Sequence, residues 1–226
     1  MNNFFVISLK KGFALGSTVC VFAYVLDRTM SNGSYNSANK ENPSLYKSGW
    51  TKIITNLTII NPPIYSIVDN FFINKLDNYI INPTHVFLLI MIHNFLYFLI
   101  HRELHINSKL YKIHSFHHRF DKLILPSTGF AVSHSEFLIA YASPLVIASI
   151  LIHPSEASFL SAISLISLFN LFIHCQELRT MKWIPGFVSP DMHITHHEVR
   201  LKHYAAPFFN FDELILDNVS LKHSNT

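Results

Sequence analysis

The chain has 226 residues, of which half are apolar and only 14% are charged, and its formal net charge is +3. An ordinary globular protein carries about 25% charged residues, so this composition excludes a typical soluble domain and indicates a membrane protein. The small net charge, with no basic stripe interleaved with aromatic residues, excludes nucleic acid as a partner.

The first predicted membrane helix covers residues 12–26 and follows Lys10 and Lys11. No small-residue cleavage pattern follows it, so we expect a signal anchor that stays attached.

Two less apolar segments come next. Residues 27–50 are rich in Ser, Asn and Lys, which is typical of a polar connector. Residues 53–81 mix apolar residues with Asn and contain Pro62 and Pro63, which break helices. That mixture favours an amphipathic or interfacial segment over a membrane span. Residues 1–83 are therefore predicted to be a membrane anchor, a connector and an interfacial segment.

Three further apolar runs cover residues 84–100, 137–152 and 159–173. Each has about 16 residues, whereas a span needs about 20, so we expect the helices to extend into their flanks. From Arg102 onward every Lys and Arg lies outside these runs, and none lies in the turn 153–158. The positive-inside rule then makes that turn non-cytoplasmic and puts the opposite ends of the helices on the cytoplasmic face.

Histidine spacing is the strongest chemical signal. The chain carries an HxxxH motif followed by two HxxHH motifs, which we call the three boxes: His101 and His105; His114, His117 and His118; His193, His196 and His197. Residues three or four apart share one face of a helix, so each box can direct its imidazoles to one point. Neutral imidazole binds zinc, iron, copper and nickel, and helical bundles build metal sites in this way.

Two isolated histidines join the boxes by position, because His134 precedes one predicted span and His174 ends another on the same face. The predicted metal ligands are His101, His105, His114, His117, His118, His134, His174, His193, His196 and His197. Ten imidazoles are too many for one ion, so we expect two. The predicted fold is all-α, an integral-membrane helical bundle with a cytosol-facing, histidine-lined di-metal cap formed within residues 84–226.

The order of the boxes, with a helical hairpin before the third, resembles the fatty acid hydroxylase/sterol desaturase superfamily of integral-membrane non-haem di-iron enzymes. The resemblance covers about residues 93–217. SHSEF at 133–137, FIHCQEL at 172–178 and KHYAAPFFNFDELI at 202–215 resemble the family's intermediate histidines and tail. His203 and Ala205 stand where the family usually has Asn and Gly, and LDN replaces its closing Phe-Gly-Thr. The ligand set is intact, and the altered tail bears on the substrate pocket.

The resemblance implies two iron ions, with zinc possible in isolated protein, and O2 as co-substrate. It implies hydroxylation or desaturation of a membrane lipid such as a fatty acyl chain, a sphingoid base or a sterol. No haem-binding or flavin motif precedes the boxes, so we expect a separate electron donor: a b-type cytochrome, a ferredoxin or a reductase. The expected location is the endoplasmic reticulum membrane for a eukaryotic or viral chain and the inner membrane for a bacterial one. Candidates to orient the imidazoles from outside are the acidic residues Glu103, Glu136, Glu177, Asp191 and Asp212.

Two alternatives remain. The first is a membrane metal transporter or metal-binding protein, and the second is a family member that has lost catalysis. Transporters hold their ions within the spans near the midplane, whereas the boxes lie at helix ends, which favours the enzyme.

Overall fold

A computed structural model describes residues 3–217 of the chain. It is 75% helical, and no strand occurs within that range. The predicted all-α fold is confirmed.

Four helical stretches are long and apolar enough to cross a membrane. They are α1 (Asn3–Thr29), α5 (Pro83–Ile106), the stretch His134–Ile152 and α9 (Glu156–Ile173). The third stretch joins α7 (His134–Glu136), the π-helix η4 (Phe137–Ala142) and α8 (Ser143–Ile152). Each stretch contains one predicted apolar run and extends beyond it, as expected because the runs alone are too short to span a membrane.

Polar side chains fix where these helices begin. Asn82 accepts from the backbone N–H groups of Thr84 and His85 at the start of α5, and Pro83 occupies the first turn. Ser155 accepts from the Ser158 N–H at the start of α9. Such caps satisfy N–H groups that have no partner within the helix.

Residues 27–50, predicted to be a polar connector, are largely helical. Beyond α1 the chain forms α2 (Asn32–Glu41) and α3 (Pro43–Ile54). The side chain of Asn42 accepts from the Leu45 N–H and Pro43 follows it, a strong helix start inside a polar stretch. Ala38, Tyr46 and Leu125 then form a small buried cluster, so packing overrides the polar composition.

The segment around Pro62 and Pro63 is also more regular than the sequence indicates. Helix α3 continues through the π-helix η1 (Thr55–Ile60) into α4 (Asn61–Phe71). Both prolines fall in the first turn of α4, and the wider π turns before them accommodate the missing hydrogen bonds.

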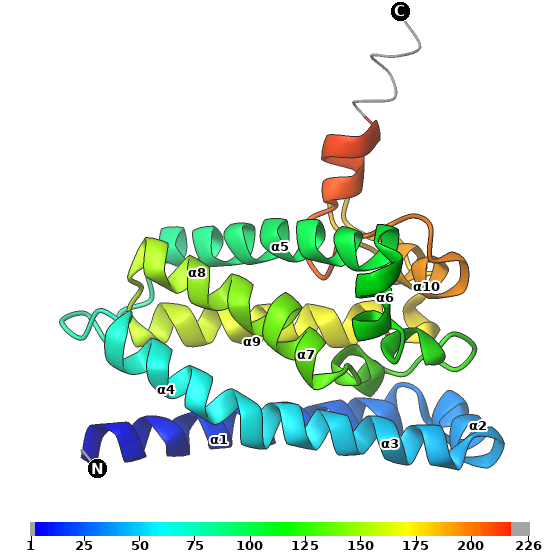
Figure 1. The fold of residues 1–226 in the computed structure, drawn as a ribbon, viewed down its shortest axis with the longest axis horizontal. Helices are drawn as coiled ribbons and strands as arrows, with labels where there is room; N and C mark the ends of the chain where they lie inside the picture. Colours follow the sequence, from blue (N-terminus) through cyan, green and yellow to red (C-terminus); the bar gives the residue numbers. More distant parts are fainter. Residues whose placement is uncertain (1–2, 218–226) are drawn as a thin grey trace, which may run out of the picture.

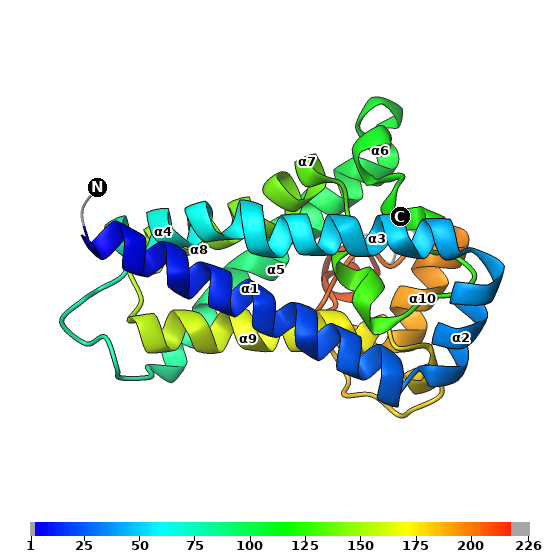
Figure 2. The ribbon, with the colours of Figure 1, turned by 90° about the horizontal axis from the view of Figure 1, so that it is seen from below.

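The long helices lie along one axis of the molecule, as Figures 1 and 2 show from two directions. Helices α2, α6 (Ser108–His114) and α10 (Pro190–Val199) gather at one end, which we call the histidine end. The start of α1 and the turn between α8 and α9 lie at the other, the far end. A buried core between the ends combines residues of α1, α3 and η1 with Phe130, Phe137 and Leu171.

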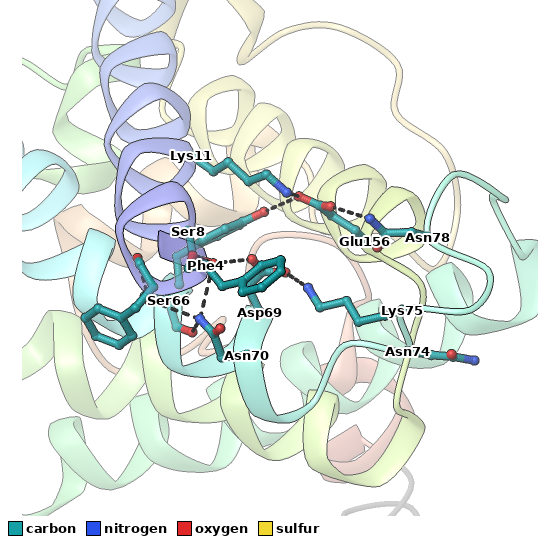
Figure 3. A network of polar contacts seen from close by, with 12 residues as sticks. Phe4, Ser8, Lys11, Ser66, Asp69, Asn70, Asn74, Lys75, Asn78 and Glu156 are labelled. Atoms are coloured by element: carbon teal, nitrogen blue, oxygen red, sulfur yellow. Dashed lines mark hydrogen bonds and ion pairs between the residues drawn. The ribbon is translucent and has the colours of Figure 1, made fainter. Parts of the chain in front are cut away.

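A polar network closes the far end (Figure 3). The Lys11 Nζ of α1 lies 2.5 Å from the Glu156 Oε1 at the start of α9, and Asn78 donates to the other carboxylate oxygen at 2.8 Å. On α4, Asp69 pairs with Lys75 and accepts from the Ser8 hydroxyl at 2.5 Å. The network therefore ties the first turns of α1 to α4 and α9.

Candidate metal centre

Four separate parts of the chain bring histidines to the histidine end. The last turns of α5 carry the first box, and α6 with the short helix η2 (His117–Arg119) carries the second. The third box lies on α10, where Ser189 accepts from the Met192 N–H and Pro190 starts the helix. His174 directly follows α9.

Nine of the ten predicted ligands form two compact clusters. The five-histidine cluster consists of His101, His105, His114, His118 and His196, and the four-histidine cluster consists of His117, His174, His193 and His197. Within each cluster the candidate ligand atoms all lie within 4.8 Å of one another. All nine side chains are buried except that of His105, which is half-buried.

The two clusters are neighbours, and both HxxHH boxes contribute to each. His117 and His118 are consecutive residues in different clusters, as are His196 and His197. Ring centroids of His118 and His197 lie 4.9 Å apart across the boundary. The second and third boxes therefore hold the clusters side by side.

The ring nitrogens have the arrangement expected of ligands that share an ion. The Nε2 atoms of His101 and His114 are 3.0 Å apart, and those of His174 and His193 are 2.9 Å apart. The opposite ring nitrogens donate outward: His101 Nδ1 to the Tyr204 carbonyl at 2.6 Å, and His174 Nδ1 to the Asn170 carbonyl at 2.6 Å. Outward donation by Nδ1–H leaves the Nε2 lone pair facing the cluster, which is the tautomer that metal binding requires.

Several buried nitrogens have no hydrogen-bond partner in the described structure. They include the Nε2 of His196, whose Nδ1 donates to the Lys202 carbonyl at 2.8 Å, and both ring nitrogens of His197. An unpartnered buried polar atom is costly, and a metal ion would satisfy the Nε2 of His196 and one ring nitrogen of His197. The residues present thus fit a metal in each cluster.

Electrostatics favours the neutral, metal-binding form of the clustered imidazoles. Burial lowers the pKa of His174 to about 4, and burial together with neighbouring imidazoles lowers the pKa values of His193 and His197 well below the usual 6.5. These side chains are therefore neutral at physiological pH, and neutral imidazole is the form that binds metal.

One acidic candidate reaches a cluster. The Glu136 Oε1 lies 2.6 Å from the Nδ1 of His114, and both side chains are buried. Glu136 is held by α7, where Ser133 accepts from its N–H. A carboxylate that accepts from the outer nitrogen orients the ring and makes it a stronger ligand.

The other acidic candidates have different partners. The exposed carboxylate of Glu103 lies 4.0 Å from Arg102, Glu177 accepts from Ser31 and Ser34, and Asp191 pairs with Arg179. Asp212 accepts from the Ala205 N–H at 2.6 Å, which supports the loop that carries Tyr204.

His134 is in neither cluster. Its Nδ1 donates to the Asn56 Oδ1 at 2.6 Å, and the Asn56 side-chain amide donates to the Val132 carbonyl at 3.1 Å. The geometry gives His134 a bridging contact between η1 and α7 in place of the predicted ligand position.

Sequence reasoning missed the carbonyl groups that orient the rings, because any residue supplies a backbone carbonyl. It also missed Gly129. A Cβ at this position would lie 2.8 Å from the Asn170 Nδ2 and 2.9 Å from the His174 Nδ1. A glycine thus gives His174 room beside the four-histidine cluster.

Comparison with known proteins agrees with this geometry. The sequence profile described as fatty acid hydroxylase matches residues 86–216, which is more than half of the chain. Neither the curated proteins nor the solved structures gave a match. The matched range contains all nine clustered histidines. The chain belongs to the fatty acid hydroxylase family.

Proposed function

We propose that the protein is an oxygen-dependent di-iron oxidoreductase that hydroxylates or desaturates a membrane lipid. The observation that carries the proposal is the pair of adjacent, buried clusters of neutral histidines at one end of a membrane bundle. Family membership supports lipid hydroxylation or desaturation as the type of reaction.

Each cluster would hold one ion, and the ions would supply the oxygen chemistry that no side chain can perform. The chain's own contribution is to orient the histidine rings and to keep them buried. Carbonyl groups and Glu136 fix the ring orientations, and burial keeps the imidazoles neutral. Electrons would come from a separate donor: a b-type cytochrome, a ferredoxin or a reductase.

The histidine end would face the cytoplasm. Lys11 and Lys75 lie in the polar network of the far end (Figure 3), whereas the elements of the histidine end carry Lys40, Lys109, Lys112, Arg119 and Arg200. This asymmetry follows the positive-inside rule. In a eukaryotic or viral setting the membrane would be the endoplasmic reticulum, and in a bacterium the inner membrane.

The path of the chain supports a fifth crossing beyond the four apolar helices. Helix α1 ends near the histidine end, where Asp27 accepts from the Ser127 N–H at 2.9 Å. Helix α5 starts at the far end, where the Asn82 N–H donates to the Ser158 hydroxyl at 2.8 Å. If α1 and α5 both span in the same direction, the stretch α3–η1–α4 must return across the bilayer.

The surface of that stretch suits lipid. Its outward side chains Ile54, Ile59 and Ile67 are 45–64% exposed, whereas Asn56 and Asp69 are buried and hydrogen-bonded. Residues 1–83 would then supply two crossings, and the catalytic part would begin near residue 84.

Lipid analysis of cells that express the wild type or His118→Ala tests the function. We expect a lipid that gains one oxygen or loses two hydrogens only with the wild type. The control His85→Ala lies at the opposite end of α5 and should behave as the wild type does. Identical lipid profiles for wild type and His118→Ala would favour a metal transporter or a family member without catalysis.

Metal analysis gives a second, independent measurement. About two ions per purified chain are expected, whether iron or zinc is bound. A value near one would contradict the dinuclear proposal.

A further inference from the structure

An apolar cavity lies inside the bundle among α1, η1, α4, η4 and α9. Its empty volume is about 620 Å³, counting the part that opens to the exterior. Apolar lining residues include Leu15, Val19, Leu57, Ile64, Leu145 and Ile166. Cavity residues come from four of the proposed crossings together with His93 of α5, so the space lies at membrane depth.

A smaller cavity adjoins it on the side of the histidine end. The two share His93, Phe130, Tyr141 and Ile166, and the smaller one adds Tyr97. The ring of Tyr97 lies 5.1 Å from that of His101 in the five-histidine cluster. The smaller cavity therefore lies one side chain away from the five-histidine cluster, with Tyr97 between them.

His93 is the one imidazole in this lining, which also includes the polar side chains of Asn61 and Ser167. It is only 4% exposed, and its Nδ1 is buried without a hydrogen-bond partner. The ring also has a hydrogen-bonding partner in the backbone of Tyr141, so the Nδ1 is the ring nitrogen left for a ligand. A buried polar nitrogen beside an apolar cavity destabilises the fold unless a ligand satisfies it, whereas a leucine there would not.

Helix geometry sets the distance from this nitrogen to the centre. His93, Tyr97 and His101 are four residues apart and share one face of α5; the rings of His93 and Tyr97 are stacked with centroids 6.3 Å apart. Eight residues of α-helix rise about 12 Å. An extended chain advances about 1.2 Å per bond, so this distance corresponds to roughly ten bonds.

The shape of the cavity depends on two irregular helices. Leu57 belongs to the π-helix η1, and Phe137 and Tyr141 belong to the π-helix η4. Each π-helix directly precedes a proline-containing helical turn. π turns widen a helix locally and often occur at functional sites. Their presence on two walls supports a built binding site.

We propose that this cavity binds the hydrocarbon chain of a lipid and that His93 hydrogen-bonds a hydroxyl or keto oxygen carried inside that chain, roughly ten bonds from its end at the metal centre. The identification of this lipid as the substrate rests on the proposed function, whereas the binding itself does not. The protein would thus prefer an already oxygenated lipid to its saturated counterpart.

Competition binding tests the proposal with full-length protein in lipid nanodiscs. Unlabelled 12-hydroxyoctadecanoate and octadecanoate compete against tritiated octadecanoate, and empty nanodiscs correct for partition into lipid. The wild type should prefer the hydroxylated acid by roughly fivefold to thirtyfold, the ratio of one buried hydrogen bond. His93→Phe should bring the two affinities together, and His93→Asn should keep part of the preference. His85→Phe, on the same helix but outside the cavity, should keep all of it.

Equal affinities in the wild type would overturn the proposal and would point to a buried water at His93. A preference that survives in His93→Phe would also overturn it. If His93→Phe does not fold, the ratio of the two affinities in the wild type and in His93→Asn still tests the proposal. Product analysis separates the two proposals: preference without lipid oxidation refutes the proposed function alone, and oxidation without preference refutes the role of His93 alone.

Discussion

At the scale of single residues, the contact between Glu136 and His114 joins α7 to the five-histidine cluster. Replacing Glu136 by Gln keeps the shape of the side chain but exchanges the carboxyl group that faces the His114 Nδ1 for an amide. We expect zinc affinity to fall by roughly 10- to 100-fold, as for other outer carboxylates. A competition titration with a chelating dye measures the zinc affinity.

The matched control is Glu103→Gln, because the carboxylate of Glu103 is exposed. Equal zinc affinity in Glu136→Gln and the wild type would show that the contact does not support metal binding.

The histidine pKa values predict how the metal-free protein responds to acid. Burial lowers the pKa of His174 to about 4, whereas an unfolded histidine titrates near 6.5. Below about pH 6.5 the unfolded state binds more protons, so folding stability falls as the pH drops from 6.5 toward 4. Thermal unfolding of metal-stripped protein between pH 8 and pH 5 should show a constant midpoint above about pH 7 and a steep fall below 6.5. An unchanged midpoint at pH 5 would contradict the lowered pKa values.

Histidine spacing predicted which residues of the boxes would lie together because it depends only on helix periodicity. Nine of the ten predicted histidines lie in the clusters, and His134 does not. His134 was predicted to be a ligand because it lies just before a span. Such a position determines at which end of the bundle the residue lies, but not where its side chain points. Its partner Asn56 is 78 residues away in sequence, and no local pattern indicates that contact.

At the scale of helices, the close approach of α1 to η1 depends on Gly16. A Cβ at Gly16 would lie 1.8 Å from the Leu57 carbonyl oxygen, a clash that no side-chain rotation can relieve. Gly12 lies one turn earlier and faces Pro62. Small residues four apart are a common way for membrane helices to pack closely.

Gly16→Val should therefore separate α1 from η1 and destabilise the protein by about 3 kcal/mol or more, the upper range for overpacking. Thermal unfolding in detergent measures the loss. Gly33→Val is the control, because no atom lies within 4 Å of a Cβ at Gly33. Equal losses in the two variants would mean that helix propensity, and not packing, explains the effect.

Apolar periodicity located the four hydrophobic helices but not the fifth long stretch. Asn56, Asn61 and Asp69 lower the mean hydropathy of residues 43–71, yet Asn56 and Asp69 are buried, and Asn61 donates to the Gly12 carbonyl on α1. A hydropathy average cannot record on which face a polar residue lies, and only the tertiary contacts show it.

At the scale of the whole molecule, the fifth crossing can be tested by labelling. In a background where Cys20 and Cys175 are replaced, single cysteines at Ser44 and Leu76 mark the two ends of the stretch α3–η1–α4. A membrane-impermeant maleimide applied to sealed vesicles should label only one of the two sites. A cysteine at Leu201, which is 79% exposed near the third box, should follow Ser44. Labelling of Ser44 and Leu76 from the same side would exclude the crossing.

Metal removal should loosen the histidine end as a unit, because the clusters join α5, α6, α9 and α10. A ligand present at a thousand times its dissociation constant stabilises a protein by about 4 kcal/mol. Chelation should therefore lower the unfolding temperature markedly, and zinc should restore it. An unfolding temperature that does not respond to chelation would contradict a metal bound in the clusters.

The alternation of cluster membership along His117–His118 and His196–His197 makes the two clusters mechanically inseparable. Each pair sits on a single turn, so the backbone position that completes one cluster also sets the other. If each cluster binds an ion, we expect the first ion to order both turns and so to favour binding of the second. By the same linkage, we expect a change that displaces either turn to disturb both clusters together.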